Sequence, residues 1–295
     1  MSVRVAVASG KGGTGKTTVA VNLAVVAARR GAAPVAYIDC DVEEPNGHIF
    51  LRPDIAECDT VEVPVPTVDE TACTACGECS RICQFKAIVL ILDRVITFPE
   101  LCHGCGGCTL ACPMGAITET PRGVGVVETG YASTSRREGN ARIRFVQGTL
   151  NVSEAMPVPV IRAVKRRVPD TPLVFLDAPP GTSCAMVESV RDADFVLLVT
   201  EPTPFGLNDL AIAVDTVREL GLHAGVVVNR HGAGDERVRS YCRDEGIDIL
   251  TEIPDDRRVA EVYSRGGIVV EELPEFARRY EELLDALQAA VPVKA

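Results

Sequence analysis

Short apolar runs alternate with helical stretches along most of the chain. Valines alternate along residues 3–7 as in a strand, few helix breakers interrupt 17–30, and 35–39 is an apolar run that ends in an acid. Further apolar strands are expected at 173–176, 195–199 and 225–228, with helices near 184–192, 207–220, 235–245, 256–265 and 274–290. Because strands that alternate with helices form a parallel sheet with helices on both faces, the pattern predicts an α/β fold with a mostly parallel sheet.

Residues 61–122 follow a different pattern. Prolines such as Pro64 open this stretch and Pro121 closes it, and between them four cysteines with the spacing C-x2-C-x2-C-x3-C occur twice, offset by 29 residues. The duplication is too short for a solenoid and indicates a compact domain of its own. The predicted organisation is therefore one discontinuous α/β domain, 1–60 and 123–295, with a small inserted α+β domain between its parts.

The composition restricts the class of protein. Of 295 residues, 46% are hydrophobic and 24% charged, which excludes a disordered chain. Apolar runs such as 87–92 are far shorter than the ~18 residues of a membrane span, and the first strand runs directly into a glycine-rich loop, so we expect a cytoplasmic protein with no signal peptide and no membrane anchor. A net charge of −11 argues against a nucleic-acid-binding face. Twelve cysteines in such a chain indicate metal or redox chemistry rather than disulfides.

A phosphate-binding loop follows the first strand. The sequence from Gly10 to Thr17 fits G-x-x-x-x-G-K-[ST], and a helix is predicted directly after it. Backbone N–H groups of such a loop bind phosphate oxygens, the loop lysine reaches the β- and γ-phosphates, and the hydroxyl of Thr17 binds Mg²⁺. The residues expected at the phosphates of ATP are Gly10, Lys11, Gly12, Gly13, Thr14, Gly15, Lys16, Thr17 and Thr18.

The second lysine of this loop carries a family resemblance. The form K-G-G-x-G-K-T, beginning at Lys11, resembles the deviant Walker A loop of the MinD/ParA-like P-loop ATPases, a branch that includes the Mrp-type iron–sulfur carriers. The resemblance implies a nucleotide-sandwiched homodimer in which Lys11 reaches the partner's phosphates. It implies Mg²⁺-dependent ATP hydrolysis with Lys11, Lys16 and Asp41 as the catalytic residues.

Two further stretches resemble the switches of that family. Asp39-Cys40-Asp41 matches the first switch. The match implies that Asp41 positions the attacking water and that Asp39 lies near the magnesium shell. The alternative is that both are ordinary acids at a strand end that only face solvent. Residues 173–182 match the D-x-P-P-G-T second switch of the Mrp-type members. This implies that Asp177 holds a Mg²⁺-bound water and that the Gly181 N–H senses the γ-phosphate.

Two short stretches in the last third of the chain match the positions that contact adenine in this family. They are Asn229, Arg230, Pro254 and Asp255. An amide side chain suits a base edge because it offers both a donor and an acceptor. Asn229 is equally consistent with a turn residue at a strand end.

The duplicated cysteine motif is the pattern of bacterial two-cluster ferredoxins. In that pattern the fourth cysteine of each run ligates the other [4Fe–4S] cluster. Cluster one is therefore expected on Cys73, Cys76, Cys79 and Cys112, and cluster two on Cys102, Cys105, Cys108 and Cys83. Zinc is the alternative occupant, although the repeated x2, x2, x3 spacing is typical of iron–sulfur clusters. Gln84 stands where the first run would usually have proline.

The two modules together resemble MinD-superfamily ATPases that carry an inserted ferredoxin domain. This resemblance implies an ATP-gated electron carrier that works between a protein donor and a protein acceptor. An iron–sulfur cluster assembly or transfer factor is the second hypothesis, and a partner-recruiting MinD-like regulatory ATPase is the third. No C-x-x-C lies outside the cysteine-rich stretch, which weighs against the second hypothesis.

Overall fold

The computed structural model describes residues 2–31, 33–134 and 142–292. Its strands are β1 (Val3–Ala8), β2 (Val35–Asp39), β3 (Asp54–Val68), β4 (Ile88–Ile91), β5 (Arg94–Thr97), β6 (Ile117–Ser133), β7 (Arg142–Leu150), β8 (Leu173–Asp177), β9 (Phe195–Thr200), β10 (Ala224–His231) and β11 (Ile249–Pro254). Its helices are α1 (Lys16–Arg30), α2 (Gly47–Leu51), α3 (Glu78–Ile82), the 3-10 helix η1 (Pro99–Leu101), α4 (Gly107–Ala111), α5 (Val158–Arg166), α6 (Cys184–Val190), α7 (Pro204–Glu219), α8 (Arg237–Asp244), α9 (Arg257–Ser264), α10 (Val269–Glu272) and α11 (Pro274–Ala290).

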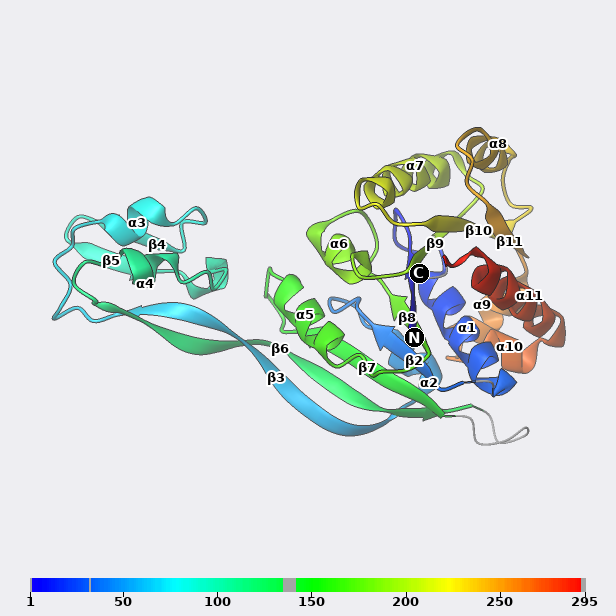
Figure 1. The fold of residues 1–295 in the computed structure, drawn as a ribbon, viewed down its shortest axis with the longest axis horizontal. Helices are drawn as coiled ribbons and strands as arrows, with labels where there is room; N and C mark the ends of the chain where they lie inside the picture. Colours follow the sequence, from blue (N-terminus) through cyan, green and yellow to red (C-terminus); the bar gives the residue numbers. More distant parts are fainter. Residues whose placement is uncertain (1, 32, 135–141, 293–295) are drawn as a thin grey trace. The chain divides into compact units, whose positions relative to one another are not determined.

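Most of the described strands form one sheet with the order β11-β10-β9-β1-β8-β2-β7-β6-β3 (Figure 1). Every neighbouring pair from β11 to β7 in this order is parallel. The expected mostly parallel sheet is therefore confirmed. Because the strands are parallel, the loops that follow β1, β2, β8, β9 and β10 meet at one edge of the sheet, which is where ligands bind in such folds.

Helices cover both faces of the sheet, as the sequence predicts. Figure 1 shows α1, α10 and α11 against one face and α5, α6 and α7 against the other. Helices α1 and α11 pack on each other, and their buried leucines, Leu23 and Leu283 among them, join the hydrophobic core. Gly31 ends α1 in the left-handed conformation with φ 65° and donates its N–H to the Ala28 carbonyl at 3.1 Å. This is the helix stop expected of a glycine.

The chain divides into two compact units. The first unit is Met1–Cys58, Val127–Thr149 and Ile161–Ala295, and the second is Asp59–Val126 with Leu150–Val160. The second unit contains the whole expected insert, 61–122, and takes in a further segment from beyond it. Strands β3 and β6 each have residues in both units, so the chain passes from one unit to the other within continuous strands.

The prolines at the two ends of the expected insert lie inside strands. Pro64 and Pro66 are part of β3, and Pro121 is part of β6. β3 is the last strand of the sheet order, and an edge strand tolerates proline because one side of it needs no N–H donor. Pro64 and Pro66 are therefore compatible with a strand at the end of the sheet order.

The second unit repeats its backbone conformation as well as its cysteines. β4 and β5 form an antiparallel hairpin, and α3 packs on α4. Positive φ angles recur at the 29-residue offset: Ala75 and Gly104 (55° and 63°), Gly77 and Gly106 (80° and 71°), and Lys86 and Gly115 (58° and 61°). Ala75 and Lys86 adopt this uncommon conformation without being glycine, at the positions where the second run has glycine, which indicates that both cysteine runs are wound in the same way.

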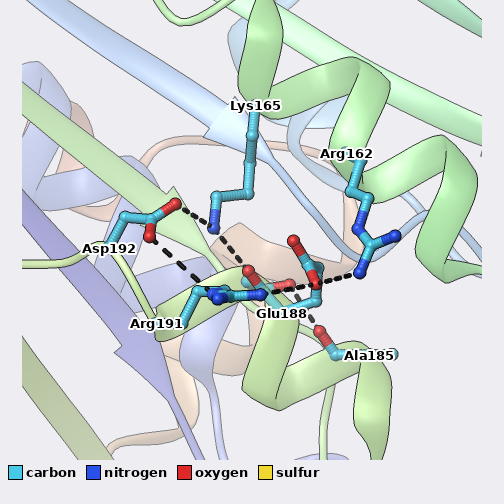
Figure 2. A network of polar contacts seen from close by, with 7 residues as sticks. Arg162, Lys165, Ala185, Glu188, Arg191 and Asp192 are labelled. Carbon is cyan, nitrogen blue, oxygen red and sulfur yellow. Dashed lines mark hydrogen bonds and ion pairs between the residues drawn. The ribbon is translucent and has the colours of Figure 1, made fainter.

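A network of polar contacts ties α6 to α5 (Figure 2). Lys165 pairs with Asp192 at 2.9 Å and also donates to the Glu188 carbonyl near the end of α6. Arg162 and Arg191 both pair with the Glu188 carboxylate, at 3.1 and 3.5 Å. Because α6 begins directly after the loop 178–183, the network fixes the helix that this loop enters.

No helix in the described part of the chain is long and apolar enough to cross a membrane.

Candidate functional site

The phosphate loop connects β1 to α1, and Asn229 from β10 braces it. The Nδ2 of Asn229 donates to the Thr14 carbonyl at 2.7 Å. Gly15 lies beside this contact with φ 93°, and a Cβ built on it would lie 2.4 Å from the same Nδ2. In this structure Asn229 therefore supports the loop, and its contact with a base stays a prediction.

We expect Gly15→Ala to lower the free energy of unfolding of the nucleotide-free protein by about 1–3 kcal/mol, because alanine must adopt a left-handed φ and displace Asn229. Thermal denaturation measures this loss. The matched control is Gly12→Ala in the same loop, where a Cβ would meet nothing within 4 Å. Equal stability of the two variants would contradict the steric role of Gly15.

Two buried carboxylates lie side by side at the strand ends. Asp39 on β2 and Asp177 on β8 are register partners, and both are almost fully buried. The hydroxyl of Tyr37 donates to Asp177 Oδ2 at 2.8 Å, whereas Oδ1 is buried with no hydrogen-bond partner among the described residues. Burial raises the pKa of both carboxyls; the Asp177 charge adds to the rise at Asp39, and Lys16 opposes the rise at Asp177. A cation is the partner that such an acidic pair requires.

Asp39 is bound to the backbone that follows it. Its Oδ1 accepts the Asp41 N–H at 3.1 Å, and its Oδ2 accepts the N–H groups of Asn46 and Gly47 at 3.1 and 2.9 Å. A carboxylate with this many backbone donors holds the loop 41–47 in place. The orphaned Oδ1 of Asp177 is thus the better candidate for a metal-bound water, and Asp39 supports it from the neighbouring strand.

Asp41 lies in the same pocket as the phosphate loop. Burial raises the pKa of Asp41 to about 6, against the opposing charge of Lys16. The pocket is lined by Gly12, Gly13, Gly15, Lys16, Thr17, Thr18, Asp41, Glu44, Asn46, Pro180, Asn229, Arg230, Ile253, Pro254, Asp255, Asp256, Val259, Ala260, Tyr263, Val269, Phe276 and Tyr280. The structure therefore brings the candidate catalytic acid, the phosphate loop and the four residues expected at the base into one cavity.

Gly181 of the second switch is engaged elsewhere in the loop cluster. Its N–H donates to the Ser9 carbonyl at 2.9 Å, and its φ is 84°. A phosphate that took this N–H would have to displace Ser9. The neighbouring Pro180 lines the nucleotide pocket directly.

Sequence reasoning missed two residues at this site. Tyr37 hydrogen bonds to Asp177, and Glu201 pairs with both Lys11, at 3.0 Å, and Arg230, at 2.7 Å. Tyr37 looks like an ordinary strand aromatic, so nothing in its pattern marks it. Glu201 directly follows the apolar strand β9, which is the same strand-end position that marks Asp39 and Asp177. That signal could have identified it.

The eight cysteines of the second unit line two separate cavities. One cavity is bounded by Cys73, Cys76, Cys79 and Cys112. The other is bounded by Cys83, Cys102, Cys105 and Cys108. Each cavity thus takes three thiols from one run and the fourth from the other run.

Backbone N–H groups are directed at these sulfurs. Gly104 N–H donates to Cys102 Sγ at 3.4 Å, and Ala116 N–H donates to Cys112 Sγ at 3.3 Å. Burial acts to raise the pKa of Cys83, but the N–H groups of residues 85–88 outweigh it and lower that pKa. Such donors stabilise thiolates. Among the residues that the structure describes, no three His, Cys, Asp or Glu side chains converge as the ligands of a single metal ion. The thiols instead line the walls of the two cavities.

The cysteines outside the second unit's cavities differ from these eight. Cys40 and Cys242 are buried, and burial raises the pKa of both thiols, that of Cys242 to about 11. They are therefore core residues in the neutral form. Cys58 and Cys184 are exposed, and Cys184 is the first residue of α6.

Comparisons with known proteins agree with this geometry. A family model described as the CobQ/CobB/MinD/ParA nucleotide binding domain matches residues 5–269. An uncharacterized protein of Methanocaldococcus jannaschii is 29% identical over 270 residues, 89% of each chain, and an iron–sulfur cluster carrier protein of Pyrococcus horikoshii is 25% identical over 313 residues, 96% of this chain and 85% of that one. The structure of the septum site-determining protein MinD of Pyrococcus horikoshii, complexed with Mg-ADP, superposes with a TM-score of 0.59 at 19% identity over the whole of both chains. This likeness shows the P-loop α/β fold.

Proposed function

The chain belongs to the CobQ/CobB/MinD/ParA family of nucleotide-binding domains. On that basis we propose that it is a Mg²⁺-dependent ATPase that itself acts as an ATP-gated electron carrier. The observation that carries the proposal is the coexistence of one nucleotide pocket and two cavities of four cysteines in a single chain. The pocket supplies a site for triphosphate chemistry, and the cavities supply sites for redox groups.

On the nucleotide side, each residue has a chemical task. The phosphate loop and Lys16 hold the phosphates, while Thr17 and Asp177 hold Mg²⁺ directly or through water. Asp41 positions the attacking water and accepts its proton. Lys11 reaches the phosphates bound to the partner in an ATP-dependent homodimer, as the family resemblance of the loop implies. Phosphoryl transfer depends mainly on positioning and charge neutralisation, which these groups provide.

In the second unit, the two sets of four cysteines fit two [4Fe–4S] clusters. The thiols outnumber any other metal ligand in the cavities, and backbone N–H groups point at the sulfurs. Clusters held there would accept and release one electron each. The chain's own contribution is to fix the thiolates and to supply N–H donors that tune the potential.

Chain continuity offers a route by which nucleotide affects the second unit. The loop 41–47, held by Asp39, leads through α2 into β3, and β3 continues into the second unit. Switch loops change when a γ-phosphate and Mg²⁺ bind. We therefore propose that ATP alters the surroundings of the clusters through this segment.

The test is a reductive titration of anaerobically purified protein with and without Mg-ATP. We expect the midpoint potentials or the rate of electron transfer to a protein acceptor to change with nucleotide. Lys16→Ala, which lacks the phosphate contact, should show no such change. Identical potentials and rates with and without nucleotide in the unmodified protein would contradict the gating.

A cluster-transfer function is the second candidate, and the similarity to an iron–sulfur cluster carrier protein favours it. Incubation with an apo-acceptor distinguishes the two functions. Iron that moves to the acceptor indicates delivery, whereas iron that stays bound while electrons pass indicates the carrier.

A further inference from the structure

Glu201 forms ion pairs with two cationic side chains, Lys11 and Arg230, at the edge of the nucleotide pocket. Its carboxylate lies 3.0 Å from Lys11 Nζ through Oε2 and 2.7 Å from Arg230 Nη1 through Oε1. The Glu201 side chain is only 10% exposed, whereas those of Lys11 and Arg230 are 31% and 56% exposed. A buried carboxylate therefore joins two more exposed cations, one of which belongs to the phosphate loop.

The sheet order explains this meeting. Strand β9 lies between β1 and β10, and Glu201 directly follows β9, while Lys11 belongs to the loop after β1 and Arg230 to the end of β10. The turn that holds Glu201 is rigid: the Thr203 N–H donates to its carbonyl at 2.8 Å, and a Cβ on Gly206 would lie 2.2 Å from the same oxygen. Glu201 is thus held in place by its turn, and Lys11 and Arg230 are the side chains that can leave the ion-pair cluster.

The burial of Glu201 determines what each departure costs. A buried charge that loses its only partner is strongly destabilising, because its desolvation is then uncompensated. With two cations present, one can leave while the other still neutralises the carboxylate. Arg230 therefore lowers the cost of releasing Lys11.

We infer that Glu201 is a positioning residue that holds the Lys11 ammonium in the nucleotide-free protomer and releases it to the partner's phosphates, with Arg230 as the remaining counter-charge. This inference rests on the proposed nucleotide-dependent dimer. It assigns Glu201 a regulatory role in dimer formation, because each protomer must first surrender an ion pair.

The two neighbours of Lys11 should act in opposite directions. Glu201→Gln removes the carboxylate that retains Lys11, so dimerisation should become easier. Arg230→Gln leaves Lys11 as the sole partner of a buried carboxylate, so dimerisation should become harder. The double variant should behave like Glu201→Gln, since Arg230 has no carboxylate left to neutralise.

The first measurement is the dimer dissociation constant by sedimentation at saturating Mg-ATP, in an Asp41→Asn background that prevents hydrolysis. We expect about tenfold tighter dimers for Glu201→Gln and about tenfold weaker dimers for Arg230→Gln, a change that corresponds to about 1.4 kcal/mol for one partly buried ion pair. Saturating nucleotide removes any change in ATP affinity caused at Arg230. Shifts in the same direction, or no shift in either variant, would overturn the inference.

The second measurement examines the ion pair in the nucleotide-free protein. Acetylation of Lys11 by an N-hydroxysuccinimide ester, followed by mass spectrometry, should be several-fold faster in Glu201→Gln and slower in Arg230→Gln, with the exposed Lys86 as internal reference. An unchanged Lys11 rate overturns the inference whatever the dimers do. The expected rates without Mg-ATP-dependent dimers in any variant would refute the proposed dimer and leave the ion-pair assignment standing. If Glu201→Gln fails to fold, the Arg230→Gln comparison still decides.

Discussion

Cys112→Ser is expected to remove the cluster of the first cysteine run rather than that of its own run. Cys112 lines the cavity of Cys73, Cys76 and Cys79, whereas the other three cysteines of its own run line the other cavity. Iron content of anaerobically purified protein should fall from about eight to about four per chain, because each cubane holds four irons. Iron and sulfide analysis with electron paramagnetic resonance measures the loss.

Double variants decide between exchanged and unexchanged ligation. The double variant Cys73→Ser with Cys112→Ser replaces two thiols of the same cavity, so it should lose no more iron than either single variant. Cys102→Ser with Cys112→Ser touches both cavities and should lose nearly all iron. Cys184→Ser, at an exposed position in the first unit, is the control and should retain full iron. The reverse ranking of the two double variants would refute the exchange.

The sequence was sufficient for five adjacent strands of the parallel sheet because each of them forms a buried apolar run that stands out from its neighbours. Strands β1, β2, β8, β9 and β10 and their helices were all expected where they lie. In contrast, β3, β6, β7 and β11 were not expected. β3 alternates exposed and buried residues over only part of its length and contains prolines, so its strand character depends on pairing with β6 rather than on local pattern.

The candidate site divides in the same way. Residues in the phosphate loop were predictable because glycine and lysine at fixed spacing reflect a demand of the phosphate itself. Tyr37 and Glu201 act through other side chains, and their partners, Asp177 and Lys11, lie far away in sequence. Contacts of this kind depend on strand order, which one sequence does not show.

Lys16→Ala and Asp41→Asn are expected to impair the ATPase at different steps. Lys16 is buried in the pocket beside the phosphate loop, so its loss should weaken ATP binding about 10- to 100-fold, the cost of one hydrogen bond to a charged group. Asp41→Asn keeps the loop and the shape of the side chain but removes the proton acceptor. It should bind ATP normally and lose about 10²–10⁴-fold in turnover, the usual contribution of a general base.

Isothermal titration with a non-hydrolysable ATP analogue and phosphate release under single-turnover conditions separate the two effects. The separation follows from the surroundings of each group: Lys16 supplies positive charge to the pocket, whereas Asp41 is a carboxylate whose pKa burial has raised to about 6, which suits proton acceptance near neutral pH. Equal turnover of Asp41→Asn and the unmodified protein would show that another group positions the water, and Glu44 lines the same pocket. Loss of binding in Asp41→Asn would instead show that Asp41 contributes to holding Mg²⁺ and the nucleotide together.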